Sequence, residues 1–166
     1  MARNTQPLLA AMTRWFAGDP RRVHHLLKVW AFTRAIGQSE GLADDALFLL
    51  ESAAITHDIG IRPAEAQYGS SAGPLQERLG PPAAAAMLGE LGYAPEEIER
   101  VCWLIGHHHT YGLDGGPDYQ ILIEADFLVN AYEDGMGPAA VASVREKVFR
   151  TRLGRQMLDD LYPSGQ

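Results

Sequence analysis

Residues 49–60 have the sequence LLESAAITHDIG, an apolar helical run that ends in an adjacent histidine and aspartate. A buried His or Asp beside such a run costs free energy unless it is paired or bound to a metal, so His57-Asp58 is the first candidate site. Successive residues of a helix point about 100° apart, and two neighbours can therefore face one ion only where the helix ends. Gly60, which suits a helix C-terminus, predicts that end between Asp58 and Gly60.

Helical periodicity continues on both sides of this run, whereas alternating Val/Ile/Thr runs and Asn-Gly hairpin turns are missing from the sequence. Prolines at helix starts, acidic first turns and glycines at helix ends give the boundaries. The expected helices cover about 8–16, 20–37, 44–58, 83–90, 95–108 and 119–132, then one that begins at Pro138 and a short last one around 157–161. We therefore expect an all-α fold, an irregular bundle of six to eight helices.

The segment 62–82 is rich in glycine, proline and serine, which predicts a long loop. Loops of this length in compact domains are often functional, so this one is a candidate lid over a site. A second loop is expected over 111–118, which contains three glycines and a proline.

With 166 residues, 46% of them hydrophobic, the chain is long and apolar enough for one globular domain with a buried core. We expect a single domain over 1–166, with its core at about 19–134 and C-terminal helices at 138–162. The apolar runs are short, and the N-terminus lacks a sustained apolar region, so we expect neither a membrane span nor a signal peptide. The single cysteine, Cys102, suits the reducing cytoplasm, where we expect the protein.

The net charge of −7 argues against bulk nucleic-acid binding. Small phosphorylated substrates stay open, because a metal ion and local bases can attract them. A basic cluster lies near the C-terminus: Arg145, Lys147, Arg150, Arg152 and Arg155. A solvated helix face is the favoured interpretation of this cluster, and a partner or phosphate site is the alternative.

Two distant residues, His25 and Asp126, complete an ordered series with His57-Asp58. Two imidazoles and two carboxylates form a mixed nitrogen and oxygen ligand set of the kind that binds divalent transition metals. This series, together with the run 49–60, resembles the HD-domain superfamily of metal-dependent phosphohydrolases. The resemblance extends over most of the chain, from about residue 19 to residue 134.

The resemblance implies one divalent transition metal ion (manganese, iron, cobalt, nickel or zinc) held by four residues: His25, His57, Asp58 and Asp126. In the family motif a small apolar residue follows the first histidine by four positions. Val29 stands in that place after His25, which favours His25 over His24. Asp126 is favoured over Glu124 as the closing ligand. Glu51, two turns before Asp58, either orients a ligand or faces solvent.

A second ion is an option that the resemblance leaves open. His108 and His109 match a pair that binds a second metal or contacts the phosphate in some members, and His107 lies outside that pair. Two departures from the richer patterns of the family count against a second ion. The stretch 76–80 has no histidine, although Glu77 could substitute, and Ile61 stands where some members have lysine.

The activity that the resemblance implies is hydrolysis of a small phosphorylated substrate, a phosphomonoester or phosphodiester, nucleotides included, by metal-activated water. Asp58 would act as both ligand and base. The residues expected to meet the substrate phosphates are Lys28, Arg62, His108 and His109. Two alternatives stay open: a nucleotide-sensing module without turnover, and a diiron oxygenase of the same superfamily. The sequence leaves the oligomeric state undetermined.

Overall fold

The computed structural model describes residues 3–163, which form nine α-helices and no strand. The helices are α1 (Gln6–Trp15), α2 (Pro20–Ser39), α3 (Asp44–Thr56), α4 (Ile61–Tyr68), α5 (Gly73–Glu90), α6 (Pro95–Ile105), α7 (Pro117–Glu133), α8 (Pro138–Lys147) and α9 (Arg152–Leu161). The predicted all-α class is confirmed. None of the helices within 3–163 has the length and apolar composition that crossing a bilayer requires.

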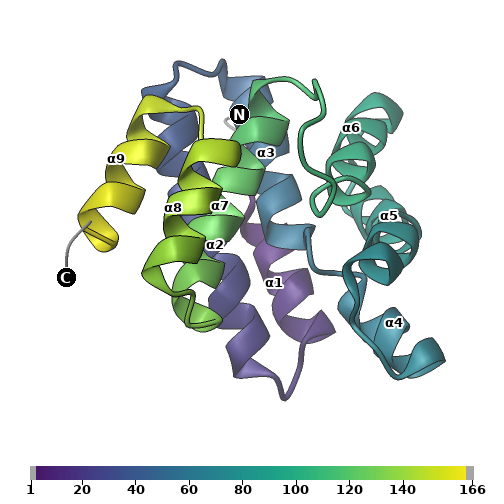
Figure 1. Cartoon of the computed structure of the whole chain (residues 1–166). Coiled ribbons are helices and arrows are strands. Elements are labelled where there is room, and N and C mark those ends of the chain that lie inside the picture. The colour runs from purple at the N-terminus through teal and green to yellow at the C-terminus, as the bar shows by residue number, and fades with distance from the viewer. Residues whose placement is uncertain (1–2, 164–166) are drawn as a thin grey trace.

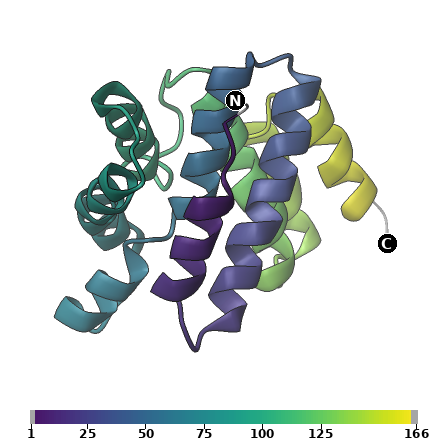
Figure 2. The same cartoon turned by 180° about the vertical axis from the view of Figure 1, so that it is seen from behind.

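Helix α3 lies at the centre of the bundle. It contacts α1, α2 and α7 on one side and α6 on the other. Figure 1 shows the α4–α6 group on one side of α3 and the α2, α7, α8 and α9 group on the other, and the view from behind in Figure 2 agrees. The apolar run of α3, which includes Leu50, Ala53 and Ile55, is completely buried. A helix that is apolar on all faces suits this place, so the run that ends in His57-Asp58 is surrounded by other helices.

Helices α2 and α7 form an extensive pair beside α3. The first begins at Pro20, after the side chain of Asp19 accepts a hydrogen bond from the backbone N–H of Arg22 at 3.2 Å. Such a cap and an N-terminal proline stabilise a helix start. Helix α7 also begins at a proline, and most of its residues from Tyr119 to Ala131 are buried. Helix α2 thus turns one face toward the centre of the molecule, whereas α7 is buried over most of its length.

The predicted loop over 62–82, and with it a lid built from that loop, is wrong. The segment folds into α4 and the first half of α5, and α5 continues through Pro81 and Pro82. Only the short link after Gly69, which has the positive φ of a helix end, is irregular. A proline inside a helix costs about 3 kcal/mol, but α5 packs along α6 with Gly80 and Ala84 buried between them. Tertiary packing here outweighs the local preference of the sequence.

Two helix ends also differ from the prediction. Helix α2 continues through Gly37 and ends at Ser39. Gly37 does not end the helix but lets the Leu47 side chain approach closely, since a Cβ on Gly37 would lie 2.7 Å from that side chain. Helix α6 ends at Ile105, earlier than predicted, and the three histidines that follow lie mainly in a turn.

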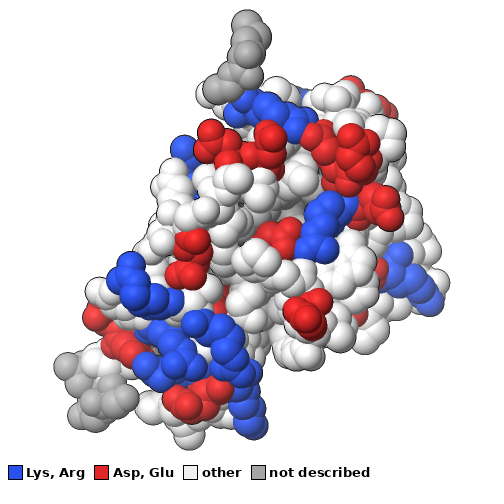
Figure 3. Space-filling model, turned by 90° about the horizontal axis from the view of Figure 1, so that it is seen from above, with Lys and Arg blue, Asp and Glu red and all other residues white. Residues whose placement is uncertain are grey.

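One member of the C-terminal basic cluster, Arg150, closes α8. The guanidinium of Arg150 donates to the backbone carbonyls of Glu146, Lys147 and Phe149 at 2.9–3.0 Å, which satisfies the free carbonyls of the helix end. Arg145 pairs with Asp159 of α9. Figure 3 shows the Lys and Arg side chains gathered on the surface next to the C-terminus. The cluster is a solvated surface, as the favoured interpretation of the sequence expects.

The backbone contact between Gly60 and α5 provides a test of this arrangement. A Cβ on Gly60 would lie 2.7 Å from the backbone oxygen of Gln76 and 2.9 Å from the nitrogen of Gly80, and backbone atoms cannot yield as a side-chain end can. We expect Gly60→Ala to lower the free energy of unfolding by about 1–3 kcal/mol, measured by urea denaturation.

Gly89→Ala is the matched control for this substitution. A Cβ on Gly89, also in a helix, meets no atom within 4 Å, so the change should stabilise the protein by about 0.5–1 kcal/mol. Equal unfolding midpoints for Gly60→Ala and the unchanged protein would contradict the proposed packing.

Candidate metal centre

Four side chains from three helices meet at the end of α3. His25 comes from α2, Asp126 from α7, and His57 and Asp58 from the turn after α3. This turn, His57–Gly60, is closed by backbone hydrogen bonds from Ile59 to Thr56 and from Ile61 to Asp58. Because the helix has ended, the two adjacent side chains point to the same place.

The ligand atoms of these four residues are close together. The Nε2 atoms of His25 and His57 are 3.1 Å apart. An oxygen of Asp126 lies 3.2 Å and 3.5 Å from these two nitrogens, and an oxygen of Asp58 lies 3.4 Å and 3.5 Å from them. Ligands bound at about 2.1 Å to one ion at tetrahedral or octahedral angles lie about 3.0–3.4 Å apart. The donor atoms of His25, His57 and Asp58, which all lie within 4.8 Å of one another, therefore fit a transition metal ion between them, and Asp126 lies beside both histidines.

Hydrogen bonds on the far side of each imidazole turn a lone pair toward this point. Nδ1 of His57 lies 2.7 Å from the backbone oxygen of Ala54, and Nδ1 of His25 lies 2.8 Å from a carboxylate oxygen of Glu133. Each Nδ1 is thus the donor, and in the neutral ring each Nε2 is an acceptor. Two acceptor nitrogens and two carboxylates then face one another. Asp126 Oδ1 is buried without a hydrogen bond, as a missing cation would leave it.

The pKa values reflect the same demand for positive charge. Burial opposes a charge on His57, but Asp58 and Asp126 outweigh it and raise the pKa of His57 to about 9. Burial would likewise raise the pKa of Asp126, yet His25 and His57 hold it well below its usual range. Without a metal, protons on the imidazoles therefore balance the carboxylates. A divalent cation would replace those protons on binding.

Glu133 supports the site, and the sequence reasoning missed it. One carboxylate oxygen accepts the hydrogen bond from His25, and the other lies 2.6 Å from Nζ of Lys28. A carboxylate behind a ligating histidine fixes its ring and tautomer. The signal in the sequence was spacing, since Glu133 follows Asp126 by seven residues, two turns along the same face of α7.

His108 and His109 lie beside Asp58, so that donor atoms of these three residues are all within 4.8 Å of one another. The Nδ1 of His108 donates to the Ile105 carbonyl at 2.7 Å, and its buried Nε2 lacks a hydrogen bond and faces Asp58 at 3.6 Å. This group gives a second ion three protein donors. His107 turns away and stacks on Trp103, as expected of a residue outside the pair.

Gln76 and Glu77 belong to the stretch 76–80, which lacks the histidine of the richer family patterns. Gln76 Oε1 lies 3.3 Å from Nε2 of His109. Glu77 accepts hydrogen bonds from the backbone N–H of His109 and from the hydroxyl of Thr110 at 2.9–3.1 Å. Its carboxylate therefore holds the turn that carries the histidines, a role different from the metal ligand suggested by the sequence.

Lys28 and Arg62, predicted to meet phosphates, are engaged by other groups. Lys28 forms its ion pair with Glu133, and Arg62 donates to the backbone oxygen of Ala17 at 2.8 Å. Their contact with a substrate stays a prediction. His24 is exposed, whereas His25 is buried in the site.

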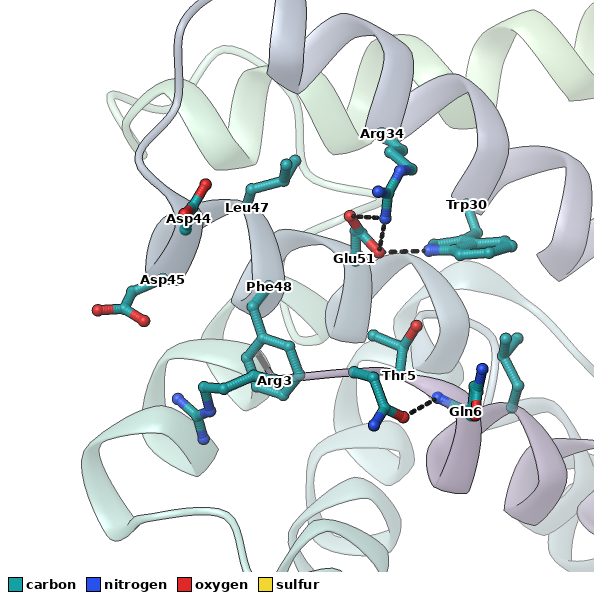
Figure 4. A pocket seen from close by; sticks show the side chains of 12 residues that line it. Arg3, Thr5, Gln6, Trp30, Arg34, Asp44, Asp45, Leu47, Phe48 and Glu51 are labelled. Carbon is teal, nitrogen blue, oxygen red and sulfur yellow. Dashed lines mark hydrogen bonds and ion pairs between the residues drawn. The ribbon is translucent and has the colours of Figure 1, made fainter. Parts of the chain in front are cut away.

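Glu51 and Glu124 face away from the metal centre. Glu51 accepts from the Trp30 indole at 2.8 Å and from Arg34 at 3.0 Å, beside a separate cavity of about 580 Å³ (Figure 4). Glu124 is buried and accepts from Gln120 and from the backbone N–H and hydroxyl of Thr151. It closes the N-terminus of α9 and neither pairs with a base nor holds a histidine.

Comparison with known proteins assigns the chain to a family. The family model described as HD domain matches residues 22–133, about two thirds of the chain, so the chain belongs to the HD domain family. The predicted resemblance is thereby confirmed. A solved structure described as a predicted HD superfamily hydrolase, from an uncultured Thermotogales bacterium, is 27% identical with a TM-score of 0.67. The match covers 95% of this chain and 85% of that one. Among proteins of curated function, none matched.

Asp126 tests the ligand set directly. We expect Asp126→Asn to weaken binding of Mn²⁺ or Zn²⁺ by more than about 100-fold, measured by calorimetry and by metal analysis of the purified protein. The substitution keeps the shape and removes the charge. His24→Gln, on the exposed face of α2, should bind metal like the unchanged protein. Full metal content in Asp126→Asn would reject this residue as a ligand.

Glu133 tests the support of His25. We expect Glu133→Gln to lower metal affinity by about 10- to 100-fold while the protein stays folded, because the amide is a weaker acceptor for the Nδ1 proton. Competition with a chelator measures the affinity. Asp134→Asn, at the exposed neighbouring residue, is the control, and a loss as large in that variant would argue against a specific role for Glu133.

Proposed function

We propose that this protein is a metal-dependent phosphohydrolase that acts on a small phosphate ester. One divalent transition metal ion would be held by His25, His57, Asp58 and Asp126. The observation that supports the proposal is the buried set of facing acceptors, whose spacing and unsatisfied oxygen suit a cation. The solved relative described as a predicted hydrolase supports hydrolysis as the reaction class.

A bound divalent ion lowers the pKa of coordinated water and polarises a phosphoryl oxygen, which is the chemistry that hydrolysis of a phosphate ester needs. Asp58 is the residue best placed to handle the proton. Its side chain is 17% exposed, against 9% or less for the other three candidate ligands. One oxygen faces His25 and His57, while the other faces His108. That second oxygen can accept a proton from an attacking water.

His108 and His109 are the candidate contacts for the phosphate itself. Burial, together with the neighbouring His108, lowers the pKa of His109 to about 4. His109 is therefore neutral near pH 7 and acts as a hydrogen-bonding group. Neutralisation of the phosphate then depends chiefly on the metal ion.

The charges around the site favour a small phosphate ester over a polyphosphate. Four carboxylates surround the site: Asp58, Asp126, Glu77 and Glu133. Their total negative charge exceeds the positive charge of one divalent ion plus Lys28. Arg22 is also committed, since it pairs with Glu65 at 2.6 Å and with Asp19. A chain of phosphates would bring further negative charge to this rim, whereas a single phosphate can sit on the ion.

Asp58 provides the test of this function. On metal-loaded protein, a panel of nucleotides and sugar phosphates should show release of phosphate, and Asp58→Ala should lower that activity by more than about 1,000-fold and lose the metal. His24→Gln serves again as the control. Full activity in Asp58→Ala would reject the proposal.

Two other results of the same panel would point elsewhere. Tight nucleotide binding without product, with metal present, would favour a sensing module. Iron in the purified protein together with oxygen consumption would favour an oxygenase.

A further inference from the structure

Two aromatic rings lie next to the metal centre, outside the candidate ligand set. Tyr111 of the α6–α7 loop and Phe127 of α7 have ring centroids 5.2 Å apart, at an interplanar angle of 47°. Phe127 directly follows Asp126, and Tyr111 follows His109 by two residues. Two separate segments of the chain thus each bring one residue of the centre and one aromatic ring, and the two rings meet.

The ring of Tyr111 is available to a ligand. The residue is 48% exposed, whereas Phe127 is half-buried behind it. Tyr111 packs on Phe127, which directly follows Asp126, and it is two residues from His109, so this aromatic surface lies beside the metal centre.

The loop that carries Tyr111 is held in place by hydrogen bonds and an ion pair to the neighbouring helices. The hydroxyl of Thr110 donates to Glu77 of α5, and its backbone oxygen accepts from the hydroxyl of Tyr119 of α7. Further along, Arg100 of α6 pairs with Asp118 and donates to the backbone oxygen of Gly115. The loop joins the α5–α6 pair to α7 (Figure 1), and these contacts fix both of its ends. A surface held in place before binding loses little entropy when a ligand arrives.

We propose that Tyr111, backed by Phe127, determines substrate specificity by stacking on a planar aromatic group carried by the phosphate ester. The inference rests on the proposed phosphohydrolase function and adds the substrate class: a monophosphate whose alcohol carries an aromatic ring system. Stacking of a nucleobase on an aromatic side chain contributes about 10- to 100-fold in affinity, so the preference is large enough to measure.

The test uses two substrates with the same reacting phosphate and the same primary alcohol, adenosine 5′-monophosphate and ribose 5-phosphate. Metal-loaded wild-type protein should prefer the nucleotide by about 10- to 100-fold in kcat/KM. Tyr111→Leu should lose this preference through the nucleotide alone, with ribose 5-phosphate turnover and metal content unchanged. Tyr111→Phe keeps the ring and should keep the preference. Tyr132→Leu, at a tyrosine that is 79% exposed and outside the site, is the matched control.

Each other outcome has a definite meaning. Equal kcat/KM for the two substrates, or an unchanged preference in Tyr111→Leu, would overturn the inference. Equal losses for both substrates in Tyr111→Leu would make the residue structural and would also overturn it. If the wild-type protein hydrolyses neither compound, calorimetric binding of the two decides the inference, and the proposed function itself fails only if no ester of the panel is hydrolysed. Tighter binding of the nucleotide that disappears in Tyr111→Leu supports the stacking surface, and equal affinities overturn it.

Discussion

The structure depends on an electrostatic constraint: four electron-rich atoms meet in a buried place where their mutual repulsion must be balanced by positive charge. The two Nε2 atoms and two carboxylate oxygens lie 3.1–3.5 Å from one another in the contacts of His25 and His57. Carboxylates pair with protonated imidazoles in the metal-free state, which is why the pKa of His57 is raised. In the proposed metal-bound state, a divalent cation would satisfy the same constraint in place of those protons.

Each part of the bundle helps to meet this constraint. The apolar α3 carries His57 and Asp58 into the centre and then ends, so that both side chains can turn to one point. Helices α2 and α7 pack against each other and bring His25 and Asp126 opposite that point. Glu133 and Lys28 complete the support from outside, since they link α7 to α2 directly behind the ring of His25. Metal affinity and the packing of these three helices are therefore expected to be coupled.

The surroundings of the site narrow its chemistry further. The rim is acidic, and the cations near it are already paired, which supports the proposed preference for a substrate with one phosphate. The aromatic pair of Tyr111 and Phe127 adds an apolar surface on the side of His109 and Asp126. In the proposed substrate complex, charge and shape act on different parts of one ligand: the phosphate faces the centre, and a planar group faces Tyr111.

By itself, the sequence determined the helical class, the end of α3 at His57-Asp58, the burial of His25 rather than His24, and membership of the HD domain family. The helical class and the helix end follow from periodicity and turn residues, which are local patterns, whereas the choice of His25 and the family membership follow from the resemblance of the His/Asp series to the family motif. Only the tertiary structure decided that most of 62–82 is helical, that Glu133 supports His25, and that Glu51 and Glu124 face elsewhere. Two kinds of contact explain this difference: the close backbone packing at Gly60 and Gly80, and the pairing of buried carboxylates. Both join segments that are distant in the chain, and local sequence patterns do not predict which distant groups will meet.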